Sequence, residues 1–132
     1  KVLDNQTGLP ITLSAICVLL AKRLNLPIVG VGMPGHYIVK YSLPIEPIYF
    51  DPFHQGRLLT KNECINIVKQ LGYPFKEHLL SQATQRETLV RMLNNLIQVY
   101  KNSSETKKAE ILSEYVKILL NPSRNQPSEK IR

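Results

Sequence analysis

At 132 residues, the chain is long enough for one domain, or for one compact core with an appendage. Its apolar fraction of 43% is ordinary for a globular protein and too high for intrinsic disorder. The net charge of +7 is spread thinly, with ten Lys/Arg against six Asp/Glu in residues 1–100 and seven against four in residues 101–132, without the basic-aromatic runs of a nucleic-acid-binding surface.

The first predicted element is a helix over residues 11–24 that is apolar nearly all round, which is typical of a buried central helix. Pro10 suits its first turn, where a missing N–H costs nothing. Asn25 suits a left-handed stop, and Pro27 prevents continuation. The apolar run is too short to span a membrane, and Lys22-Arg23 stands where a signal-peptide cleavage site should lie, so we expect neither. The chain begins without Met inside what reads as a continuous element, which leaves room for a preceding segment.

Three short strands are predicted next, over residues 28–32, 36–41 and 47–50. Residues 42–46 form the hairpin between the second and the third. This half of the chain therefore predicts an α+β fold with one helix on a small antiparallel sheet.

The second half predicts helices. Thr60 and Glu63 form a capping box for a helix that runs to about Leu71, and Thr84 and Glu87 form another. Ser104 is expected to cap a last helix, so that residues 84–120 end in a helical hairpin of tetratricopeptide-like length. We thus expect a core over 1–58, a helical segment over 59–120 and a polar tail over 121–132.

Two runs, one containing a histidine and the other an aspartate, indicate a possible site. His36 heads the second predicted strand and Asp51 ends the third. An imidazole oriented by a carboxylate is two-thirds of a nucleophilic triad, whose third member would be Cys or Ser. Asp51 before Pro52 also has a purely structural interpretation, because Asp-Pro initiates turns.

Several segments resemble the transglutaminase-like core, and more narrowly its bacterial SirB-type branch; they are Gly8-Leu9-Pro10-Ile11-Thr12-Leu13, residues 19–27, Gly32-Met33-Pro34-Gly35-His36, Phe50-Asp51-Pro52-Phe53, residues 56–64 and residues 91–96. The resemblance implies a papain-like α+β fold with a nucleophile at the N-terminus of the central helix. It also implies that His36 and Asp51 match the catalytic histidine and aspartate. The cysteine position falls at or next to Pro10, and proline is not a nucleophile.

Two residues of the same helix are alternative nucleophiles. Cys17 lies about 10 Å further along the helix axis than Pro10 and is flanked by apolar residues, which is typical of an inert buried thiol. Ser14 is one turn in, but a helical hydroxyl usually bonds a carbonyl a turn earlier. Cys64 falls on a separate helix and is interpreted as core. The unpaired spacing of the two cysteines indicates reduced thiols in a cytoplasmic protein.

A metal site at His36, Asp51 and His54 is conceivable from the ligand types alone. The three lack the close spacing of a zinc motif, so we expect no metal or cofactor, with His54 exposed in a loop. The sequence favours a non-catalytic transglutaminase-like domain that serves as a protein-interaction or regulatory module and binds a protein partner. A cysteine-protease-type hydrolase or acyltransferase with a displaced nucleophile is the alternative, and a basic nucleic-acid-associated domain is the second alternative.

Overall fold

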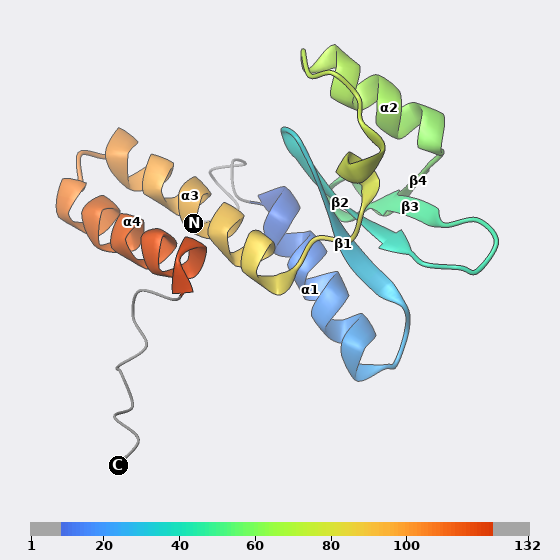
Figure 1. The fold of residues 1–132 in the computed structure, drawn as a ribbon, viewed down its shortest axis with the longest axis horizontal. Helices are drawn as coiled ribbons and strands as arrows, with labels where there is room; N and C mark the ends of the chain where they lie inside the picture. Colours follow the sequence, from blue (N-terminus) through green and yellow to red (C-terminus); the bar gives the residue numbers. More distant parts are fainter. Residues whose placement is uncertain (1–8, 123–132) are drawn as a thin grey trace. The chain divides into compact units, whose positions relative to one another are not determined.

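The computed structural model describes residues 9–122 of the chain. These residues fall into two compact units that divide between Thr88 and Leu89, which we describe separately. The first contains one long helix, a sheet of four strands and a second helix, and the second is a helical hairpin (Figure 1). This arrangement confirms the predicted α+β class, with the hairpin after the sheet-containing part. Within the described residues, no helix has both the length and the hydropathy to cross a bilayer.

The sheet is antiparallel throughout, in the order β1-β2-β3-β4. The predicted strands correspond to β1 (Ile28–Met33), β2 (His36–Tyr41) and β3 (Ile48–Asp51). The prediction missed β4 (Arg57–Leu59), which pairs with β3 after the short 3-10 helix η1 (Pro52–His54). The hairpin between β2 and β3 is confirmed.

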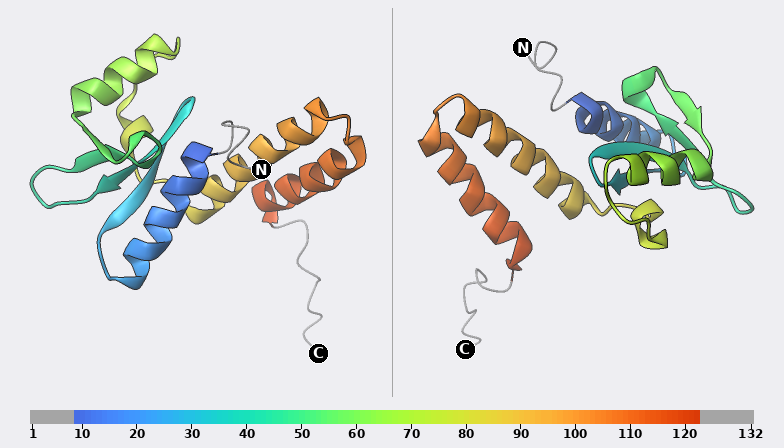
Figure 2. Two further views of the ribbon diagram at one scale, coloured as in Figure 1. Left: turned by 180° about the vertical axis from the view of Figure 1, so that it is seen from behind. Right: turned by 90° about the horizontal axis from the view of Figure 1, so that it is seen from above.

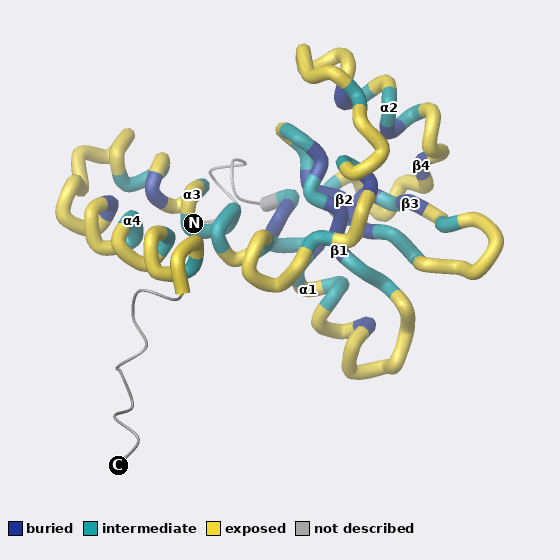
Figure 3. The backbone as a smooth tube through the Cα atoms, viewed as in Figure 1, coloured by how far each residue is buried: buried dark blue, intermediate teal, exposed yellow. Residues whose placement is uncertain are grey.

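One face of the sheet packs on α2 (Lys61–Gln70) and on the 3-10 helix η2 (Glu77–Leu80). The capping box predicted for α2 is present, with both Thr60–Glu63 hydrogen bonds made. The core on this face, dark blue in Figure 3, consists of Val31, Met33, Ile38, Tyr49, Leu59, Cys64, Val68 and Leu80. Strand side chains alternate between faces, so the buried Tyr37 and Val39 point the other way.

That second face of the sheet packs on α1 (Leu9–Arg23), so that α1 and α2 lie on opposite sides of the strands (Figure 2). The helix ends as predicted, with Asn25 in the left-handed conformation at φ 55°. The prediction that α1 is buried all round is wrong. Ile16, Leu19 and Leu20 are 48% to 60% exposed, because the sheet covers only one side of the helix.

The second unit takes most of its residues from α3 (Gln85–Asn102) and α4 (Thr106–Leu120). The capping box predicted before α3 forms, because Thr84 and Glu87 exchange hydrogen bonds. The predicted cap of α4 is wrong. Glu105 occupies the N-cap position, and Ser104 instead lies in the turn with a left-handed φ of 61°. Of the tail predicted over 121–132, residues 123–132 lie outside the described part of the chain.

Candidate functional site

The antiparallel pairing of β2 and β3 brings His36 and Asp51 together. Val39 pairs with Phe50, so Asp51 lies opposite Ile38, two residues from His36 and on the same face of the sheet. Diagonal neighbours of this kind are within reach of long side chains. The Nε2 atom of His36 lies 2.5 Å from Oδ2 of Asp51. The predicted pairing of these two residues is therefore present in the structure.

The Asp51 carboxylate is almost fully buried and has four hydrogen-bond donors around it. Oδ1 accepts from the backbone N–H groups of Phe53, at 3.0 Å, and of His54, at 3.3 Å, which caps η1. Oδ2 accepts from His36 and also from Nδ1 of His54, at 2.7 Å. Since an ionised carboxylate only accepts, each ring nitrogen that faces it carries a hydrogen.

This environment sets the charge of Asp51. Burial by itself acts to raise the pKa of the carboxyl group, because it penalises the charged form. The hydrogen bonds from His54 and His36 and the electrostatic attraction of His36 act in the opposite direction and outweigh burial, so the pKa of Asp51 lies below its ordinary value of 3.8. Asp51 is therefore an anion at neutral pH, clamped between two imidazole rings.

His54 was expected to be an exposed loop residue. Its side chain is indeed 60% exposed, but its ring turns back onto Asp51. The turn that permits this is η1, which Asp51 itself caps and which ends at Gln55 with a left-handed φ of 58°. The two imidazole rings are tilted by 52° with centroids 5.7 Å apart, so they flank the carboxylate rather than stack.

A cavity of about 330 Å³ opens beside this cluster. Among the described residues its lining comes from the start of β2, from β3, η1 and β4, and from α2; it consists of Gly35, His36, Asp51, His54, Arg57, Leu59, Ile67, Gln70 and Leu71. The described part of α1 contributes no lining residue. It packs mainly on the opposite face of the sheet and also contacts η1.

The two alternative nucleophiles, Ser14 and Cys17, both lie on α1. Ser14 is fully buried, and its hydroxyl donates to the backbone carbonyl of Tyr37 at 3.3 Å. Cys17 is partly buried on α1, and Pro10 lies in the first turn of that helix. Cys64 lies in the core on the α2 side, where burial and then the charge of Glu63 raise the pKa of its thiol to about 11. None of these four residues lines the cavity at His36.

Comparison with known sequences identifies the family. The model of the transglutaminase-like superfamily matches residues 1–94 of this chain. The chain belongs to the transglutaminase-like superfamily. This confirms the resemblance seen in the Pro-Gly-His and Asp-Pro-Phe segments, which supply the His36 and Asp51 described above.

Relatives of this transglutaminase-like domain occur in bacteria and in mammals. A UPF0162 protein of Xylella fastidiosa is 34% identical over 115 residues, which are 83% of this chain and 41% of that protein. A UPF0162 protein of Pseudomonas aeruginosa is 33% identical over 107 residues, 79% of this chain and 38% of that protein. Human F-box only protein 21 is 26% identical over 128 residues, 91% of this chain and 20% of that protein. The chain thus spans less than half the length of these relatives. No solved structure matches it significantly.

Proposed function

We propose that this chain is a non-catalytic transglutaminase-like domain that binds a protein partner in the cytoplasm. The observation that carries the proposal is that no candidate nucleophile lines the cavity of His36 and Asp51. Helix α1, which carries Ser14 and Cys17, packs mainly on the other face of the sheet and reaches the cavity side only through its contact with η1. The buried hydroxyl of Ser14 already has a backbone acceptor and offers a substrate no route of approach.

The apolar face of α1 supports an interaction role. Ile16 and Leu20 lie about one turn apart on α1, Leu19 lies beside them, and Leu24 follows directly after the helix ends at Arg23. Each is about half exposed or more. Large exposed apolar patches on soluble proteins mark interaction sites, including those for protein partners.

Two further facts are consistent with this proposal. The matched region makes up 41% of a bacterial relative and 20% of a mammalian one, as expected of a module used within proteins of different length. Cys17 and Cys64 are both free thiols, which suits a reducing compartment.

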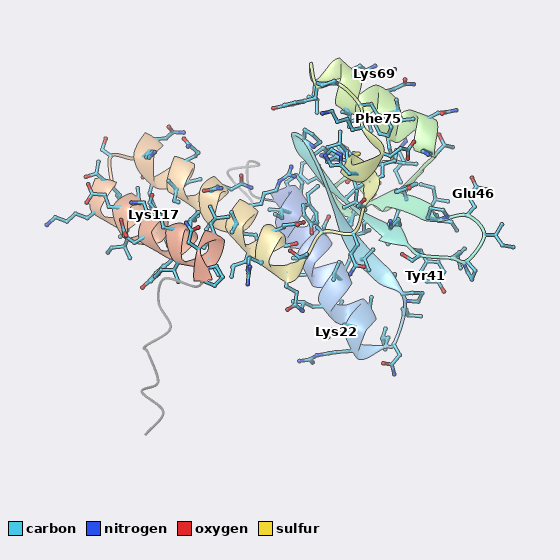
Figure 4. The ribbon with its side chains drawn as sticks, viewed as in Figure 1. Lys22, Tyr41, Glu46, Lys69, Phe75 and Lys117 are labelled. Carbon is cyan, nitrogen blue, oxygen red and sulfur yellow. The ribbon has the colours of Figure 1, made fainter. Side chains whose placement is uncertain are left out.

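The proposal is tested by changing these apolar side chains without disturbing the fold. Leu20→Glu combined with Leu24→Glu adds charge at two side chains that are more than half exposed, so the free energy of unfolding should change little. Lys22→Glu is the matched control, because Lys22 lies on the same helix between the two leucines and points away from the sheet (Figure 4). Partners cross-linked to the tagged chain in cells would be identified by mass spectrometry.

We expect a partner that is captured by the wild type and by Lys22→Glu but lost from the double leucine variant. Equal capture by all three chains would refute the role of α1. Separately, labelling by a thiol- or serine-directed electrophile that disappears in His36→Ala would refute the non-catalytic assignment and favour a hydrolase or acyltransferase.

A further inference from the structure

We propose that His36, Asp51 and His54 bind one divalent transition-metal ion, with Zn²⁺ as the preferred ion. The proposal is independent of the α1 surface and goes beyond a binding role for that helix. It starts from the convergence of three side chains: Nε2 of His36 and Nδ1 of His54 both face Oδ2 of Asp51, and one possible ligand atom from each residue lies within 4.8 Å of the other two.

The chemistry of these donors selects the class of ion. Two imidazole nitrogens with one carboxylate oxygen suit zinc and related transition metals, whereas calcium and magnesium prefer oxygen ligands alone. Three protein ligands with one open position are also the usual arrangement of a zinc site that takes up a water or another small ligand.

The carboxylate is already held in the orientation that such a site needs. The backbone N–H groups of Phe53 and His54 fix Oδ1 of Asp51, so Oδ2 is directed between the two imidazole rings. Hydrogen bonds of this kind behind a ligand orient it and raise metal affinity. They come from η1, the same short turn that carries His54, so the turn positions two of the three ligands.

Binding needs only a small rearrangement. With metal–ligand distances near 2.1 Å, tetrahedral geometry places ligand atoms about 3.4 Å apart. The two nitrogen–oxygen distances here are 2.5 and 2.7 Å and must lengthen by less than about 1 Å, whereas the two nitrogens, which lie within 4.8 Å of each other, must come to about 3.4 Å apart. His54 can move easily because its side chain is 60% exposed. Each imidazole must also present a lone pair, so the hydrogen that now faces Asp51 moves to the other ring nitrogen.

The fourth coordination position would open toward the cavity of about 330 Å³. Arg57 lines this cavity, and its guanidinium group lies 3.3 Å from the carboxylate of Glu63. The negative charge of Glu63 therefore offsets the positive charge of Arg57 near a bound cation. The cavity is large enough for a metal-bound water or a small anionic ligand.

The test is a Zn²⁺ titration of the whole chain after treatment with a chelator, followed by calorimetry. Co²⁺ would report the coordination geometry by its visible absorption. His54→Ala removes a mostly exposed ligand and should keep the fold, which circular dichroism would verify. The chain offers a matched control, because it has three histidines and His78 lies exposed on η2, outside the cluster. Cys17→Ser controls for binding by a thiol.

We expect one equivalent of Zn²⁺ with a tetrahedral Co²⁺ spectrum. Loss of a hydrogen bond that supports a metal ligand can lower metal affinity by roughly 100-fold, and loss of the ligand itself in His54→Ala should lower the Zn²⁺ affinity at least as much. The Zn²⁺ affinity should stay unchanged in His78→Ala and Cys17→Ser. Three results would overturn the proposal: no binding by the wild type, equal weakening in His54→Ala and His78→Ala, or binding that depends on Cys17 instead of His54.

Discussion

Replacing Asp51 by Ala should destabilise the first unit by about 2–4 kcal/mol. The loss of the cap of η1 contributes about 1 kcal/mol, because two backbone N–H groups lose their acceptor. His36 contributes about 1–3 kcal/mol more, since its side chain is only 15% exposed and its N–H would be left without a partner. His54 adds little, because its exposed ring can turn to water.

Urea unfolding followed by far-UV circular dichroism would measure this loss. Asp51→Asn keeps an oxygen that can accept from the backbone N–H groups, so it should lose about 1 kcal/mol less than Asp51→Ala. His54→Ala should cost less than about 1 kcal/mol. A stability of Asp51→Ala within about 0.5 kcal/mol of the wild type, or a loss in His54→Ala as large as in Asp51→Ala, would refute this role of the carboxylate.

Three other predictions concern acid, thiol reactivity and packing. Because the folded-state pKa of Asp51 lies below 3.8, its ionised form stabilises the fold above that pH, and this contribution is lost as the pH falls through the lower folded value. The difference in free energy of unfolding between wild type and Asp51→Asn should therefore shrink between pH 7 and pH 3. An unchanged difference in urea titrations would contradict this. At pH 8 a disulfide reagent should label Cys17 before Cys64, whose thiol has a pKa of about 11 and is buried, and both at once in denaturant; fast labelling of Cys64 in the native chain would be inconsistent with the core described here. Gly30→Ala should cost about 1–3 kcal/mol, because the added Cβ would lie 2.0 Å from the Tyr37 hydroxyl, and Tyr37→Phe in the same chain should restore part of the loss of melting temperature; no recovery would assign the cost elsewhere.

The elements that could be predicted from the sequence are those with local signals. The capping boxes at Thr60 and Thr84 and the left-handed stop at Asn25 depend on residues within a few positions, and all three are present. Ser104 shows the limit of such signals, because a capping residue type can equally occupy a left-handed turn. The strand β4 was missed because three residues are too few to show an alternating pattern.

The site was only partly predictable for a different reason. The pairing of His36 with Asp51 follows from strand order, which the sequence indicates. The contact of the His54 ring with Asp51 depends on the 3-10 turn between them, and no periodic sequence pattern predicts such a turn. Likewise, the composition of α1 shows that it is apolar but not which of its sides another element covers.

The four hydrogen bonds to Asp51 have a consequence for interpreting protein families. The carboxylate closes a turn, joins the ends of two strands and holds two rings, so it stabilises the fold whether or not any reaction takes place. Selection for folding alone would then preserve a histidine and an aspartate in the arrangement of a catalytic pair. In proteins built like this one, the presence of the histidine–aspartate pair indicates the fold. Whether such a protein is catalytic has to be judged from the presence of a nucleophile.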